Sequence, residues 1–199
     1  MLSRNVLLYL LILVAGFALS AQAAWVDLDR GLTDRPVVTA SGSGDLVTVD
    51  IELPGFDLAT MTIDGRTYSS VTLPGHQSAM ERGYPELPII ATSVMIAGIG
   101  APEMRIVDAT WAEFDVDPVA PSKGHFKRDV DPAMVSHAFA DLYVDGGVWP
   151  TEALELGDPF IVRDLRGVNL QVRPFRYDAD RGVLMVLTDV TIEVTVKGN

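Results

Sequence analysis

The sequence predicts an all-β protein, a jelly-roll-like β-sandwich with one or two short helices, preceded by a signal peptide. Residues 47–53 and 168–173 alternate between apolar and polar side chains, and this period of two is typical of strands with one buried face. Similar short segments recur along the chain, separated by Gly, Pro and Asp residues that form turns. Helix signals are weak by comparison, so the pattern favours a sandwich of sheets.

Residues 1–23 have the pattern of a secretory signal peptide. Arg4 supplies positive charge, residues 6–19 form an apolar run without a charged side chain, and Ala21-Gln22-Ala23 offers a small-x-small cleavage site. The alternative is an uncleaved anchor, but the run is shorter than the ~20 apolar residues that span a bilayer. We therefore expect cleavage after Ala23, one domain over residues 24–199, and a secreted or periplasmic protein without membrane attachment.

The chain is acidic and contains no cysteine. It has 27 acidic and 15 basic residues, which gives a net charge of −12 at pH 7. Such a surface repels nucleic acid and anionic membranes, and it suits either solubility alone or the attraction of a basic partner. Without cysteine the chain can form no disulfide, no thiol nucleophile and no cysteine-based metal site.

The expected strands of the N-terminal half are separated by clear turn sequences. The strand at residues 47–53 is followed by a hairpin at residues 61–68, whose central Asp64-Gly65 supplies the positive φ that a two-residue turn needs. The proline-rich residues 73–88 indicate an exposed loop. Residues 89–97 are largely apolar with several β-branched side chains, which indicates a buried strand.

The central part of the chain combines a strand, a loop and the two weak helix signals. Residues 117–131 indicate a second exposed loop, and residues 150–156 a single helical turn. A short helix is expected at residues 132–142, because Asp131 can cap it and Pro132 suits its first position. The strand predicted at residues 104–116 is expected to bury Ile106, Trp111, Phe114 and Val116.

The C-terminal part predicts the closing strands of the sandwich. The strand at residues 168–173 stops at Pro174, and two further strands are expected at residues 183–187 and 190–196. Between them, residues 178–182 begin like a calcium loop, with Asp178 and Asp180, but lack the terminal glutamate at the required spacing. Since apolar strands flank the segment on both sides, we interpret it as a hairpin turn.

No catalytic or metal constellation stands out in the sequence. His76, His125 and His137 lack the spacing of metal ligands, and no serine or aspartate pattern accompanies them, so they are interpreted as surface residues. Gly98 and Gly100 lack the third glycine of a dinucleotide fingerprint and the lysine of a phosphate loop. These observations argue against an enzyme and against a cofactor.

A basic segment, Lys123 to Arg128, stands out in this acidic chain. It can be a solvated surface loop with a chance cluster of bases. It can equally be a recognition loop that offers a basic side chain to an acidic pocket, because the planar guanidinium of arginine pairs bidentately with a carboxylate. Composition alone leaves both interpretations open.

Three segments of the chain read as motifs: Gly83-Tyr-Pro-Glu-Leu-Pro-Ile89, Ala120-Pro-Ser-Lys-Gly124 and Asp158-Pro-Phe-Ile-Val-Arg-Asp-Leu-Arg-Gly167. In sequence and in order they resemble segments of the N-terminal prodomains of gingipain-type cysteine proteases. The resemblance covers about residues 83–196. The motif residues, for which a structural role is expected, are Gly83, Pro85, Leu87, Pro88, Pro121, Ser122, Asp158, Pro159, Arg163, Asp164, Arg166 and Gly167.

The resemblance implies a prodomain that inhibits a caspase-like cysteine protease by blocking its active-site cleft. The inhibitory loop would comprise Lys123, Gly124, Lys127 and Arg128, with Arg128 in the specificity pocket of an Arg-directed protease. It also implies a role in assisting the folding of the protease, in cis as part of a truncated precursor or in trans. The alternative is a secreted module that binds carbohydrate or a cell-surface partner through aromatic side chains such as Tyr143 or Trp149.

Overall fold

The computed structural model describes residues 23–28, 31, 34–43 and 45–197. Within these ranges the chain forms thirteen strands, one 3-10 turn and one single-turn helix, so the all-β prediction is confirmed. No helix in this part of the chain is long and apolar enough to cross a membrane. The signal peptide predicted at residues 1–23 falls almost entirely outside the described residues.

A six-stranded antiparallel sheet forms one layer of the molecule. The long strand β13 lies at its centre, with β7 along one side and β3 and β12 along the other. The sheet continues from β3 to β2 and from β12 to β8. Its strands are β2 (Val37–Ser43), β3 (Leu46–Glu52), β7 (Ala101–Asp115), β8 (Val148–Trp149), β12 (Phe175–Asp178) and β13 (Val183–Lys197).

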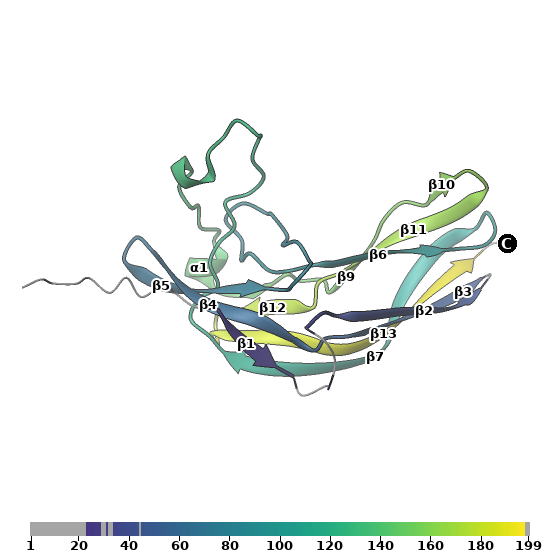
Figure 1. Cartoon of the computed structure of the whole chain (residues 1–199), viewed down its shortest axis with the longest axis horizontal. Helices are drawn as coiled ribbons and strands as arrows, with labels where there is room; N and C mark the ends of the chain where they lie inside the picture. The colour runs from purple at the N-terminus through teal and green to yellow at the C-terminus, as the bar shows by residue number, and fades with distance from the viewer. Residues whose placement is uncertain (1–22, 29–30, 32–33, 44, 198–199) are drawn as a thin grey trace, which may run out of the picture.

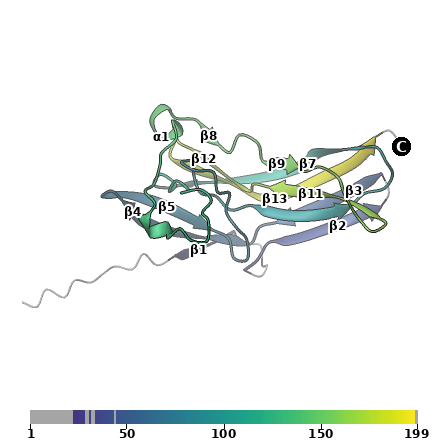
Figure 2. The ribbon, with the colours of Figure 1, turned by 90° about the horizontal axis from the view of Figure 1, so that it is seen from above.

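Two smaller sheets cover this layer. In Figure 1 the strands β6 and β11 lie above β13 and β7, and the β4–β5 hairpin reaches the left end of the molecule. Seen from above, the long strands of both layers run along the long axis (Figure 2). One sheet comprises β6 (Ile90–Met95), β9 (Leu154–Leu156), β10 (Phe160–Val162) and β11 (Leu165–Val172), and the other β1 (Ala24–Asp27), β4 (Gly55–Ile63) and β5 (Arg66–Thr72).

The core lies between these layers and follows the alternation of the strands. Every second residue of β3 is buried, as the pattern at residues 47–53 predicts. The Phe56 ring meets Phe175 and Phe114 edge to face, with centroids 5.3 and 5.5 Å apart. Burial of an aliphatic or aromatic side chain of this kind contributes about 1.5–3 kcal/mol, so the clean alternation of the central strands accounts for the sandwich.

Several sequence predictions are confirmed. The hairpin at residues 61–68 turns at Asp64 and Gly65, whose φ values are 49° and 79°. The strand at residues 168–173 is β11, and residues 178–182 join β12 to β13 as a hairpin. Residues 73–88 and 117–131 are loops, apart from isolated bridges.

Residues 183–187 and 190–196 form one strand, β13, not two as predicted. Leu187 pairs with Trp111 and Asp189 with Thr110, so Thr188 is an extra residue at an irregularity in the ladder. The polar pair Thr188-Asp189 separates two apolar runs in the sequence, but the strand continues across it without a turn.

The burial predicted for β7 and β6 is partly wrong. Ile106 and Trp111 are exposed, while Phe114 and Val116 are half-buried. A second register shift, between Thr191 and Ile192, interrupts the pairing of β7, so its inward-facing residues do not follow one regular alternation along the strand. The apolar segment at residues 89–97 is a half-buried strand, because its alternate residues face the solvent.

The helix predicted at residues 132–142 is wrong in extent, and the helical turn predicted at residues 150–156 is wrong altogether. Asp131 does cap a helical turn, since its side chain accepts a hydrogen bond from the Ala133 N–H at 2.9 Å, but only the 3-10 turn Pro132–Met134 follows. The α-helix α1 (Leu142–Asp145) begins where the prediction ends. Residues 154–156 form the strand β9, because their backbone pairs with β11.

Candidate inhibitory arm

Residues 123–139 form an arm that projects from the sandwich at the end where α1 lies (Figure 1). Both ends of the arm are tied to Gly83. The Gly83 N–H donates to the Ser122 carbonyl at 2.8 Å, and its carbonyl accepts from the Ala140 N–H at 2.9 Å. Gly83 is buried with φ at 88°, and a Cβ there would lie 3.3 Å from the Ala140 nitrogen. The motif glycine therefore clamps the root of the arm.

The outgoing limb is fixed between two neighbouring segments. On one side Ala120 donates to the Ser69 carbonyl of β5 at 2.8 Å. On the other side Ser122 donates to the Tyr84 carbonyl at 2.8 Å, and Glu86 donates to Ala120 at 2.9 Å. These backbone hydrogen bonds hold residues 118–122 between two neighbouring segments, as a strand is held in a sheet. The arm therefore leaves the sandwich from an ordered base.

A small second core supports the root of the arm. It contains Ile63, Tyr68 and Ala120, with Tyr143 packed against them. The Tyr143 hydroxyl donates to the Val119 carbonyl at 2.7 Å, and burial raises the pKa of that hydroxyl well above its usual range. The phenol therefore stays protonated and remains a donor at physiological pH.

The two aromatic side chains considered for carbohydrate binding are engaged within the protein. Tyr143 is half-buried, its hydroxyl is bonded to Val119, and its ring meets Phe139 edge to face at 5.4 Å. Trp149 is also half-buried, and its ring lies 4.1 Å from that of Tyr84. Neither ring stands free as a platform for a sugar.

The four basic-loop residues divide into two pairs. Lys123 is half-buried and donates to the Pro132 carbonyl at 2.9 Å, which joins the two limbs. Gly124 is buried with φ at 87°, and a Cβ there would lie 3.0 Å from the Arg82 side chain. Lys127 and Arg128 are exposed. Lys123 and Gly124 therefore hold the arm in place, while Lys127 and Arg128 point into the solvent from its tip.

Arg128 sits at the apex of a turn. The Val130 N–H donates to the Lys127 carbonyl at 3.1 Å, which places Arg128 and Asp129 at the two central positions. Among the described residues, neither the Lys127 ammonium nor the Arg128 guanidinium forms a hydrogen bond or an ion pair. Both cations are therefore available to a partner.

A cavity of about 310 Å³ lies beneath the arm. Its wall includes Met61, Met80, Phe126, Lys123 and His137. Burial lowers the pKa of His137, and the positive charge of Lys123 lowers it further, against the opposing charge of Asp64. His137 is therefore half-buried at the root of the arm, where its surroundings favour the neutral imidazole.

The other two histidines lie apart from His137. His125 is exposed as predicted, whereas His76 is half-buried. Burial is also the main cause that lowers the pKa of His76. In the part of the chain that the structure describes, no group of three His, Cys, Asp or Glu residues is arranged to hold a metal ion.

The first two family motifs meet at the root of the arm. Pro85 forms an isolated bridge with Pro121, and Pro88 forms another with Ser78. Their structural role was expected from the resemblance alone, and the contact between the two motifs could not be read from the sequence. The motif residues Pro85, Leu87, Pro88, Pro121 and Ser122 are all buried.

The third motif lies at the opposite end of the molecule, in the β10–β11 hairpin. The Arg166 guanidinium donates to the carbonyls of Gly98 and Gly100 at 2.9 and 2.8 Å, which fixes the loop before β7. Gly167 is covered by the Phe160 ring and has no room for a side chain. The remaining motif residues are exposed on or near the hairpin: Asp158, Pro159, Arg163 and Asp164.

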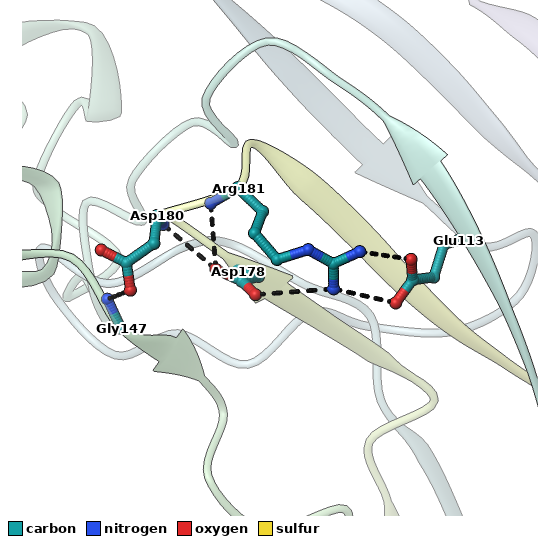
Figure 3. Close-up of polar contacts among 5 residues, drawn as sticks. All are labelled: Glu113, Gly147, Asp178, Asp180 and Arg181. Atoms are coloured by element: carbon teal, nitrogen blue, oxygen red, sulfur yellow. Dashed lines mark hydrogen bonds and ion pairs between the residues drawn. The ribbon is translucent and has the colours of Figure 1, made fainter.

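The segment that resembled a calcium loop is a hairpin turn, as predicted. One Asp178 oxygen accepts from the N–H groups of Asp180 and Arg181, both at 3.1 Å, and Asp180 accepts from the Gly147 N–H at 2.9 Å (Figure 3). Arg181 bridges Asp178 and Glu113, with its shortest contact to Glu113 at 2.5 Å. Both aspartates thus accept backbone hydrogen bonds, Asp178 within the turn and Asp180 from the neighbouring Gly147.

Comparison with known protein families identifies the chain. The family model Propeptide_C25 matches residues 33–199. The chain belongs to the C25 propeptide family. The match begins far upstream of Gly83, so the relationship includes the strands β2 to β5, where the sequence carried little resemblance. Membership of a propeptide family also confirms the interpretation of the chain as a non-catalytic domain.

The curated relatives of this C25 propeptide domain are gingipains of Porphyromonas gingivalis. Gingipain R1 is 30% identical over 115 residues, which are 58% of this chain and 12% of the relative. Lys-gingipain HG66 is 25% identical over 201 residues, which are 98% of this chain and 12% of the relative. The chain therefore spans 12% of the length of either relative.

Two solved structures share the fold. The complex of the RgpB pro- and mature domains from Porphyromonas gingivalis matches with a TM-score of 0.76 and 23% identity, over 81% of this chain and 86% of that chain. A structure of gingipain K from the same organism, concerning its zymogenic latency, matches with a TM-score of 0.74 and 23% identity. It covers 89% of this chain and 100% of the other. Both likenesses support the sandwich assignment.

Proposed function

We propose that this C25 propeptide domain is an exported inhibitor of a gingipain-type cysteine protease and blocks the active-site cleft with its arm. Arg128 would enter the pocket that reads the arginine of a substrate, and Lys127 would lie at its entrance. The domain would act in cis within a longer precursor or in trans on a separate protease, and would assist the folding of that protease. The pattern of residues 1–23 supports export.

The observation that carries this proposal is the presentation of Arg128. It stands at the apex of a turn, exposed, on an arm whose two ends are hydrogen-bonded to one buried glycine, Gly83. Because the root of the arm is already ordered, binding loses less conformational entropy than it would with a free loop. An unpaired guanidinium is also ready to form two parallel hydrogen bonds with a carboxylate in a pocket.

Inhibition constants of arm variants test the proposal. A pocket carboxylate left desolvated and unpaired costs about 2–5 kcal/mol, so Arg128→Ala should weaken inhibition of an Arg-specific gingipain by about thirty-fold or more. Arg128→Lys should weaken it less, because the charge remains while the bidentate geometry is lost. Lys127→Ala should have a small effect.

Arg105→Ala provides the control, because Arg105 is an exposed arginine on β7, in the other layer of the sandwich, where it pairs with Glu193. It should inhibit like the wild type. Melting curves should be unchanged for the arm variants, since exposed residues rarely contribute more than ~0.5 kcal/mol to stability. Equal inhibition by wild type and Arg128→Ala would exclude Arg128 as the inhibitory residue.

A further inference from the structure

On this strongly acidic protein, the outer face of the β6–β11 ladder carries no charged side chain, and Glu155 of the neighbouring β9 is paired with Arg173. The ladder pairs Asn169 with Ser93 and Gly167 with Met95, and the hairpin pairs Val162 with Leu165. The alternation of buried and exposed residues places these side chains on the solvent side, opposite the core residues of the same strands. The residues of this outer face are Ala91, Ser93, Met95, Phe160, Val162, Leu165, Gly167, Asn169 and Gln171.

The half of this outer face farthest from the arm is apolar. Met95 is 64% exposed, Val162 58% and Leu165 52%, which are high values for side chains of this size. Gly167 lies between Met95 and Phe160 in the ladder, and its missing side chain lets the Phe160 ring lie across the backbone. Several large, exposed apolar side chains on one face of a sheet mark a place of contact with another molecule.

The arm stands over the other half of the same face. A depression of about 510 Å³ is lined by Met80 and His125 on the side of the arm and by Glu155, Gln171 and Arg173 on the side of the sheet. Glu155 and Arg173 form an ion pair at 2.7 Å, so the charges here are matched. In Figure 1 the arm and the β10–β11 hairpin rise on the same side of the molecule, with β6 and β11 between them.

The exposed tip of the arm is too small to form a stable interface alone. Specific protein complexes bury about 800 Å² per partner, with roughly 20–30 residues on each side. The exposed run at the tip, residues 125–134, is far shorter. A globular partner that holds the tip therefore needs a second surface, and the outer face of the β6–β11 sheet is the one that the arm overhangs.

We propose that this outer face is a second docking surface for the protease domain that receives the arm, with Met95, Val162 and Leu165 as its apolar anchor. This inference rests on the proposed function. The partner surface would be apolar where it meets the β10–β11 hairpin and would offer hydrogen-bonding groups to Ser93 and Asn169. The two contacts lie at opposite ends of the sheet, so their contributions to affinity should add.

Dissociation constants for the mature domain of an Arg-specific gingipain test this surface. The variants are Val162→Glu with Leu165→Glu, Arg128→Ala, and the combination of all three. Val107→Glu is the matched control, since Val107 is 48% exposed on β7 in the other layer. We expect the double variant to bind at least about ten-fold more weakly, because two charges would be buried without partners, and the control to bind like the wild type.

The outcomes separate this surface from the inhibitory arm. If Arg128→Ala weakens binding while the double variant binds like the wild type, the docking surface is refuted and the proposed function stands. If the double variant alone weakens binding, the docking surface stands and the role of Arg128 is refuted. If the wild type does not bind, both are refuted. If the double variant instead abolishes self-association of the free domain and leaves protease binding intact, the occupant is a second copy and the inference is wrong.

Discussion

Replacement of Gly83 by alanine should loosen the arm more than any substitution at its tip. Gly83 adopts φ of 88°, a left-handed conformation that costs a residue with a Cβ about 1–2 kcal/mol. The new Cβ would also lie 3.3 Å from the Ala140 nitrogen, whose hydrogen bond to the Gly83 carbonyl closes the returning limb. Loss of that bond adds about 0.5–1.5 kcal/mol, so the total is about 1.5–3.5 kcal/mol.

Gly75→Ala separates the two contributions. Gly75 has a similar φ of 80°, but nothing lies within 4 Å of the position of its Cβ. It should therefore cost only the backbone strain, about 1–2 kcal/mol. The difference between the two variants measures the crowding against Ala140, and it should appear in urea unfolding curves as a lower free energy of unfolding for Gly83→Ala.

Tryptic cleavage of the arm provides the second assay. Lys127 and Arg128 are exposed, and cleavage there should be faster in Gly83→Ala because the arm detaches more often from its root. Gly75→Ala should be cut like the wild type. Equal unfolding free energies and equal cleavage rates for the two variants would refute the clamp at Gly83.

Three further predictions concern other parts of the molecule. The hydrogen bond from Arg181 lowers the pKa of Glu113 from 4.5, so the pair stabilises the fold above about pH 4.5, and this contribution is lost as the pH falls through the lowered pKa. Glu113→Gln should therefore flatten the dependence of the unfolding free energy on pH below 4.5, and an unchanged slope would contradict this. Tyr143→Phe should cost about 1–2 kcal/mol in urea unfolding, since the Val119 carbonyl loses its donor, and wild-type stability would refute that role. Protein recovered from a secreting host should begin at Ala24 by mass spectrometry, and retention of the leader on a membrane species would exclude cleavage there.

The sequence is informative where one physical signal decides the outcome. Strict alternation at residues 47–53 predicts β3, because a strand with one buried face leaves little choice of register. Asp64-Gly65 predicts a hairpin for a similar reason, since few sequences adopt positive φ at both turn positions. The exposed cations Lys127 and Arg128 were also predictable as a basic loop in an acidic chain.

Predictions that depend on distant contacts are the ones that failed. Ile106 and Trp111 are exposed although their partners in β13, Ile192 and Leu187, are buried, because β7 is an edge strand that pairs with β13 alone, and the sequence of β7 does not record that position. The expected helix at residues 132–142 gives way to an extended limb whose end is bonded to Gly83. Gly124 is likewise buried beside Arg82, which lies 42 residues upstream in a different loop.

The absence of cysteine from the chain allows a direct test of where the arm binds. A single thiol introduced by Asp129→Cys lies next to Arg128, which is kept. In the proposed complex, where Arg128 fills the specificity pocket, this thiol would lie close to the catalytic cysteine of the protease. A disulfide needs Cα atoms about 4.4–6.8 Å apart, so it forms only if the apex enters the cleft. We predict a specific cross-link to the catalytic cysteine with Asp129→Cys and none with the exposed control Val107→Cys. A complex in which Asp129→Cys forms no disulfide, or cross-links no better than Val107→Cys, would contradict the account.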